Sequence, residues 1–368
     1  MQWQTVPVDG DGTKLGYIDS GAPPTSSYTT VVLVHGHTFN APVFSRLLPL
    51  AQQNDLRLIA LNQRDYVNST PFADAELDIL SSNDEVAHMN FFRARGLEYA
   101  RFLCWVIKEL NIPRLDPAES SGGLAFLGWS LGNLTTIAFL AYLDSCPPEI
   151  IQTLKPYLKS FFIYGAPHMF LGYPIPPGTY NPFYVPENPM RIAPLSFASW
   201  VSAYYKHPAD SESGSTVTPD AFIQHEPEKH YRPCTTDTMS TDELSMTLDL
   251  TPNARSERFY FDMSFPMLHN MLEKALLGAN NSPLPNMKVY YIFGLEDIWL
   301  IHWAAVEFKK DLAKWEDERK DPRPIKVIPV AEANHFVSCD TGIIGSLSCL
   351  LMLYHGRYIG TTPRVSWT

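Results

Sequence analysis

Short, continuous runs of apolar and often β-branched residues recur along the chain and predict buried strands. The run at residues 31–34 has no polar alternation, which is typical of a strand covered on both faces of a sheet. Similar runs occupy residues 56–61, 124–129, 159–164, 289–293 and 325–330. Between these runs, apolar positions at helical spacing predict helices over residues 84–110, 131–143, 303–318 and 341–354. The alternation predicts an α/β fold: a mostly parallel sheet flanked by helices.

This alternation stops between about residues 167 and 266. The stretch contains fourteen of the 31 prolines and many aromatic residues, and helical spacing appears at residues 195–205 and 253–277. Such a change inside an α/β pattern indicates an insertion between two strands. We therefore expect an α/β core formed by residues 1–166 and 270–368, with residues 167–269 as an inserted, mainly helical cap.

Composition and charge narrow the class of protein. The chain has 368 residues, of which 45% are hydrophobic, enough for a full core without disulfides. The net charge of −11 argues against nucleic acid or anionic membrane as a partner. The most apolar stretch near the end, residues 342–354, is too short to span a bilayer. Five scattered cysteines and an N-terminus without a secretory signal favour a cytoplasmic protein, whose oligomeric state stays open.

The central chemical motif is Gly-Trp-Ser-Leu-Gly at residues 128–132. A predicted strand leads directly into it and a predicted helix directly follows, which is the context of a serine held on a tight strand-to-helix turn. Gly128 and Gly132 are expected where a Cβ would collide with the crossing strand and helix. The helix N-terminus also directs free N–H groups toward Ser130.

A serine hydroxyl needs a base to take its proton, and that base needs an acid to orient it. Asp297 follows the strand predicted at residues 289–293, with Glu296 as the alternative carboxylate. His335 is the only histidine between the last predicted strand and the last predicted helix. Ser130, Asp297 and His335 thus each follow a different predicted strand, in the order Ser, Asp, His.

An oxyanion hole needs two N–H donors, and the sequence offers a second one after the first buried strand. Gly36 allows close approach of the backbone, so the amide of His37 is expected to act with that of Leu131. His35 and His37 also form a His-x-His pair, but no Asp-His or cysteine pair supports a metal site. The two histidines at 225 and 230 are five residues apart with a proline between them, which excludes a zincin helix.

On these motifs the chain resembles the lid-bearing, carboxylesterase- and lipase-like serine hydrolases of the α/β-hydrolase fold. The resemblance implies Ser130 as nucleophile, Asp297 as acid, His335 as base, and the amides of His37 and Leu131 as oxyanion hole. The chain departs from the pattern of this family at two places, and we expect both to reshape the pocket. Asn133 replaces a glycine common after the serine turn, and residues 62–69 lack the glycines usual after the third strand. A serine at position 130 excludes the aspartate nucleophile of epoxide hydrolases and haloalkane dehalogenases.

The expected reaction is hydrolysis of an ester or thioester of a hydrophobic small molecule through an acyl-enzyme, with no metal or organic cofactor. Trp129 and Met267 are the candidate substrate-binding residues, because one flanks the serine and the other lies in an aromatic- and methionine-rich cap. The same triad also serves lactone or carbon–carbon bond hydrolysis and cofactor-free lyase chemistry. A non-catalytic ligand receptor on the same fold is a further alternative.

Overall fold

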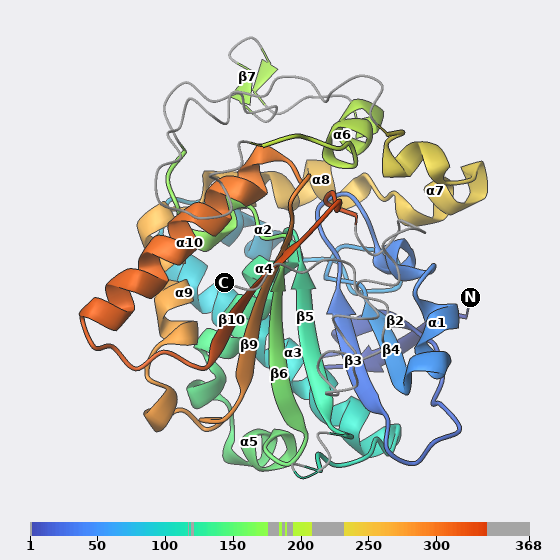
Figure 1. The fold of residues 1–368 in the computed structure, drawn as a ribbon, viewed down its shortest axis with the longest axis vertical. Coiled ribbons are helices and arrows are strands. Elements are labelled where there is room, and N and C mark those ends of the chain that lie inside the picture. Colours follow the sequence, from blue (N-terminus) through green and yellow to red (C-terminus); the bar gives the residue numbers. More distant parts are fainter. Residues whose placement is uncertain are drawn as a thin grey trace.

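The computed structural model contains a large mixed sheet (Figure 1). It describes residues 2–116, 118, 121–175, 184–185, 188–189, 194–207 and 232–336. Within them, eight strands pair in the order β1-β2-β4-β3-β5-β6-β9-β10. Their bounds are Gln4–Pro7, Lys14–Asp19, Leu56–Leu61, Thr29–Val34, Leu124–Trp129, Leu158–Tyr164, Lys288–Gly294 and Ile325–Val330 in that order. The six strands from β4 to β10 are parallel, which confirms the predicted fold class.

Helices pack on the sheet and on one another. In the view of Figure 1, α3 and α4 lie behind the strands, and α4 also contacts α9. The helices of the described part of the chain are α1 (Leu48–Ala51), α2 (Asp74–Ser81), α3 (Glu85–Glu109), α4 (Gly132–Ala141), α5 (Pro148–Leu154), α6 (Pro194–Val201), α7 (Thr241–Thr247), α8 (Thr251–Arg255), α9 (Phe265–Leu276) and α10 (Trp299–Asp317). The expected boundary at residue 270 falls inside α9.

Predicted strands coincide with observed ones wherever the strand is buried on both faces. β3, β5 and β6 are buried at every residue, which is why a continuous apolar run marks them. The two antiparallel strands, β1 and β2, were missed. β1 has only four residues with one buried, and β2 contains a glycine and begins with a lysine, so neither forms a continuous apolar run.

Helical spacing at residues 253–277 corresponds to three consecutive helical segments in the structure. They are α8, a 3₁₀ segment (η8, Glu257–Asp262) and α9. Ser256 leaves helical geometry between the first two, and Ser264 caps α9 by accepting from the Met267 N–H, with Pro266 in the first turn. A proline is tolerated in a first turn but breaks a helix interior, so the chain restarts there. The helix predicted at residues 341–354 lies outside the described residues.

Elements from the predicted insertion lie at the carboxyl ends of the parallel strands. Figure 1 shows α6, α7 and α8 above these strand ends, together with the short β7 (Tyr184–Val185) that pairs with β8 (Asn188–Pro189). Parallel α/β sheets bind their ligands at this edge, so the elements border the place where a site is expected. None of the helices in the described part of the chain combines the length and apolar composition needed to cross a bilayer.

Candidate active site

Ser130 occupies a strained turn between β5 and α4. Its φ is +54°, a left-handed conformation that is costly for a residue with a Cβ. The Ser130 N–H donates to the Tyr164 carbonyl at the end of β6, and the side-chain amide of Asn133 donates to the carbonyls of Ser130 and Tyr164, each at 2.9 Å. Asn133, the departure from the usual glycine, therefore ties the strained turn to the neighbouring strand.

The two glycines of the motif allow a tight crossing. A Cβ on Gly132 would lie 2.5 Å from the His35 carbonyl oxygen and 2.7 Å from that of Val34, so α4 could not start so close to β3 with any other residue. A Cβ on Gly128 would lie 2.9 Å from the Asn133 Cα. The sequence-based reason for both glycines agrees with these distances.

Asp297 and His335 lie in direct contact beyond β9 and β10. His335 Nδ1 is 3.0 Å from Asp297 Oδ1 and 3.1 Å from Oδ2, and Ile298 donates its N–H to Oδ1 at 2.7 Å. Asp297 is completely buried, so desolvation raises the pKa of its carboxyl, while contact with His335 acts in the opposite direction. The structure thus brings Asp297, rather than the alternative Glu296, to the histidine.

This contact assigns the histidine tautomer. A carboxylate only accepts, so His335 Nδ1 carries the proton and the lone pair of the neutral ring is on Nε2. His335 Nε2 is buried and has no hydrogen-bond partner among the described residues. Such an atom is suited to take a proton from a nearby hydroxyl. In this structure no hydrogen bond joins it to Ser130 Oγ, a bond that often forms only when substrate binds.

The side chain of Trp129 packs against the loop that carries His335. Its side chain is 1% exposed, its indole N–H donates to the His335 carbonyl at 3.0 Å, and its ring lies 5.2 Å from the His335 ring. Tyr164 donates its hydroxyl to the same carbonyl at 3.2 Å. Trp129 and Tyr164 therefore hold the loop that carries His335, and the role of Trp129 in substrate binding stays a prediction. Tyr164 was missed because nothing in its local sequence indicates this contact.

Met267 also lies in the packing of the protein. It is 4% exposed and belongs to the buried side of α9, a helix that contacts α4 and the 3₁₀ segment η4 (His168–Leu171). No described contact joins Met267 to Ser130, Asp297 or His335. Its role in substrate binding stays a prediction.

The loop after β3 lies directly against the serine. A Cβ on Gly36 would be 2.7 Å from Ser130 Cβ and 3.2 Å from Ser130 Oγ, so the backbone before His37 touches the serine side chain. Leu131, the other expected donor, directly precedes α4 and is fully buried. His37 directly follows Gly36, and Leu131 directly follows Ser130, so the role of their amides as oxyanion donors stays a prediction.

Replacing Gly36 with alanine is expected to slow reaction at Ser130 by about tenfold or more, because the added methyl must displace the serine or the loop, and displacements of about 1 Å can cost two orders of magnitude. The measurement is the rate of labelling by a fluorophosphonate, followed by intact-protein mass. Gly10→Ala is the matched control, since nothing lies within 4 Å of a Cβ at that position. Equal labelling rates for the two variants would contradict the expected crowding.

His35 and His37 have separate environments. His35 is fully buried, its Nδ1 lies 2.9 Å from the Gly36 carbonyl and its Nε2 accepts the Gln63 N–H at 3.1 Å. Burial lowers the pKa of His35 to about 4, so the ring is neutral and both nitrogens are used in holding the loop. His37 instead contacts Glu257 and Asn253. The two histidines of the His-x-His pair thus make separate contacts, and both help to hold the loop in place.

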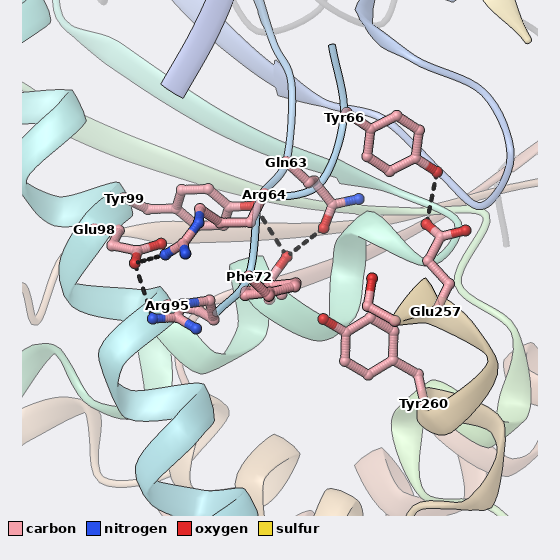
Figure 2. Close-up of a pocket in the computed structure, with 11 residues that line it drawn as sticks. Gln63, Arg64, Tyr66, Phe72, Arg95, Glu98, Tyr99, Glu257 and Tyr260 are labelled. Carbon is pink, nitrogen blue, oxygen red and sulfur yellow. Dashed lines mark hydrogen bonds and ion pairs between the residues drawn. The ribbon is translucent and has the colours of Figure 1, made fainter. Parts of the chain in front are cut away.

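Two residues that contact His35, Gln63 and Tyr66, line a narrow polar pocket. Figure 2 shows Tyr66 and Glu257 bonded to each other on one side and Glu98 between Arg64 and Arg95 on the other. The pocket has room for only about one water molecule. It is therefore a buried polar network and not a cavity for a substrate.

Comparison with solved structures shows that the chain shares its fold with known proteins. No family model matches the sequence, and no curated protein matches it significantly. Epoxide hydrolase A from Mycobacterium thermoresistibile has a TM-score of 0.50 and 15% identity, covering 96% of this chain and 97% of that one. An epoxide hydrolase from Solanum tuberosum has a TM-score of 0.50 and 12% identity, covering 97% and 100%. Both have the fold that the sequence motifs imply, and likeness at this identity does not extend to the reaction.

Proposed function

Because the chain has the α/β-hydrolase fold, we propose that it is a serine hydrolase that cleaves an ester or thioester of a hydrophobic small molecule. The observation that carries the proposal is the strained Ser130, which lies at the same sheet edge as a buried His335–Asp297 pair whose Nε2 has no other described partner. The two similar structures are named as epoxide hydrolases, and they support the proposal through the shared fold alone.

In the proposed reaction, Ser130 Oγ attacks the carbonyl carbon while His335 Nε2 takes its proton. Asp297 holds the Nδ1 proton and stabilises the imidazolium that forms. The amides of His37 and Leu131 donate to the oxyanion of the tetrahedral intermediate. His335 then protonates the leaving group, and a water molecule attacks the acyl-enzyme by the same route.

The proposed preference for a hydrophobic substrate rests on the residues around the site. The His37 ring lies 5.3 Å from Phe197 of α6 and 5.2 Å from Phe261 of η8, so aromatic side chains of the predicted insertion border the loop that contacts Ser130. Apolar walls with a few placed polar groups are typical of small-molecule pockets. An acyl or aromatic group fits this chemistry better than a sugar or a peptide.

The direct test is intact-protein mass spectrometry after exposure to a fluorophosphonate. Attack by Ser130 forms an oxygen–phosphorus bond and releases fluoride, so one adduct on the wild-type protein is expected. p-Nitrophenyl esters and acyl thioesters of graded length then define the acyl group. Absence of any adduct on folded protein would contradict an activated serine and favour a ligand receptor on the same fold, which ligand-binding measurements would test.

A further inference from the structure

The loop that contacts Ser130 is held by residues far away in the sequence. Its backbone pairs with the segment before α8: the Asn40 N–H donates to the Thr247 carbonyl at 2.8 Å, and the Asp249 N–H donates to the Thr38 carbonyl at 2.9 Å. Phe39 and Leu248 form an antiparallel bridge between these bonds. The loop is therefore attached to the predicted insertion as well as to β3.

A buried carboxylate adds side-chain contacts to this attachment. Glu257, at the start of η8, is 2% exposed, and its Oε2 lies 2.6 Å from His37 Nδ1. Its Oε1 accepts the Tyr66 hydroxyl at 2.6 Å, and Oε2 also lies 3.4 Å from the Thr38 amide nitrogen (Figure 2 shows the Tyr66 bond). Burial and the nearby Glu257 charge raise the pKa of Tyr66, so its hydroxyl remains a donor.

The other nitrogen of His37 is also occupied from the insertion. Asn253 Nδ2 lies 3.3 Å from His37 Nε2. If Nδ1 carries the proton toward Glu257, then Nε2 has the lone pair that the Asn253 amide needs, so the two contacts require the same tautomer. The ring of the residue expected to supply an oxyanion donor thereby has a polar group of the insertion close to each of its nitrogens.

We propose that Glu257 is a positioning residue, which holds His37 and so sets the backbone of residues 36–38 for oxyanion stabilisation at Ser130. The inference rests on the proposed function. Under this inference, the conformation of the loop that contacts Ser130 depends on the position of η8. Ser130 is then fully reactive only when η8 packs against this loop. The carboxylate acts through His37 and touches no reacting atom.

The test compares Glu257→Gln with wild type in the rate constant for fluorophosphonate labelling and in kcat and KM toward a p-nitrophenyl ester. A glutamine has a single accepting oxygen and no charge, so it cannot replace both carboxylate oxygens that face Tyr66 and His37, which loosens the loop. We expect labelling and kcat to fall about 10- to 100-fold with KM nearly unchanged, as for a partly displaced oxyanion donor. Wild-type labelling and kcat in folded Glu257→Gln would overturn the inference.

The matched control is Glu98→Gln in the same polar network. Glu98 is 6% exposed and lies 2.8 Å from both Arg64 and Arg95, but it contacts no residue of the loop at 35–38 (Figure 2). We expect this change to lower Tm and leave labelling unchanged. An equal loss of labelling in Glu98→Gln would show that general destabilisation explains the effect, which would also overturn the inference.

A double-mutant cycle tests whether Glu257 acts through His37. In a His37→Ala background, Glu257→Gln is expected to cause no further loss of labelling rate, whereas independent effects would multiply and contradict the inference. If Glu257→Gln does not fold, the labelling rate of Asn253→Ala tests the inference instead. A slower rate than wild type supports the inference, and a wild-type rate overturns it. Failure of the wild-type protein to label at Ser130 is a separate result that overturns the proposed function itself.

Discussion

Replacing Ser130 with alanine is expected to remove the fluorophosphonate adduct completely and to lower ester turnover on the order of 10⁴-fold or more. The proposed mechanism has one nucleophile, and neither His335 nor the oxyanion donors can replace the bond that Ser130 Oγ makes to the acyl carbon. Residual turnover would come from polarisation of the carbonyl and attack by water. Intact-protein mass and p-nitrophenyl ester kinetics measure the two effects.

The fold of this variant should be unaffected. Alanine keeps the Cβ and therefore the same left-handed strain at φ +54°, and the backbone bond from residue 130 to Tyr164 does not involve the hydroxyl. We expect Tm within a few degrees of wild type. Ser160→Ala is the matched control: this serine lies buried in β6, and its hydroxyl has no partner among the described residues. Wild-type turnover in Ser130→Ala would exclude the proposed mechanism.

Replacing Asp297 with asparagine is expected to lower kcat on the order of 10⁴-fold, while the geometry of the site stays nearly the same. An asparagine that presents its NH₂ group to His335 Nδ1 stabilises the tautomer with the proton on Nε2. That tautomer cannot accept the Ser130 proton. The loss should appear in kcat, and the rate of fluorophosphonate labelling should fall in parallel.

The stability of Asp297→Asn should change in the direction opposite to its activity. Burial raises the pKa of Asp297 in the folded protein, so ionising this carboxyl as pH rises favours the unfolded chain. Asparagine removes this cost and still accepts the Ile298 N–H. We therefore expect the Tm of the variant to equal or exceed that of wild type at neutral pH, with a difference that shrinks as pH falls through the folded-state pKa.

The control for this pair of measurements is Asp311→Asn on α10. Asp311 accepts the Tyr173 hydroxyl at 2.6 Å and lies 3.7 Å from His269, away from the three proposed catalytic residues. Its replacement should lower Tm and leave kcat unchanged. A higher kcat in Asp297→Asn than in Asp311→Asn would contradict the role proposed for Asp297.

Most of the parallel sheet could be predicted because a strand buried on both faces has a continuous apolar run in its own sequence. Strands β3 and β5 each contain a continuous apolar run, and the glycines at 128 and 132 flank Ser130 within a motif of five residues. The order of Ser130, Asp297 and His335 could be predicted for the same reason, since each directly follows a recognisable strand. β1 and β2 have no such run, because β1 is short and polar or glycine residues interrupt β2.

Only the tertiary structure decided how distant residues meet at the site. It brought Asp297 rather than Glu296 to His335, bonded the Trp129 indole to the His335 carbonyl, and gave Asn133 a role in the serine turn. It also brought Glu257 to His37 across 220 residues of chain. Periodicity and turn chemistry depend on neighbours within a few residues. These contacts depend instead on how segments far apart in the sequence pack at the strand ends, so no local pattern specifies them.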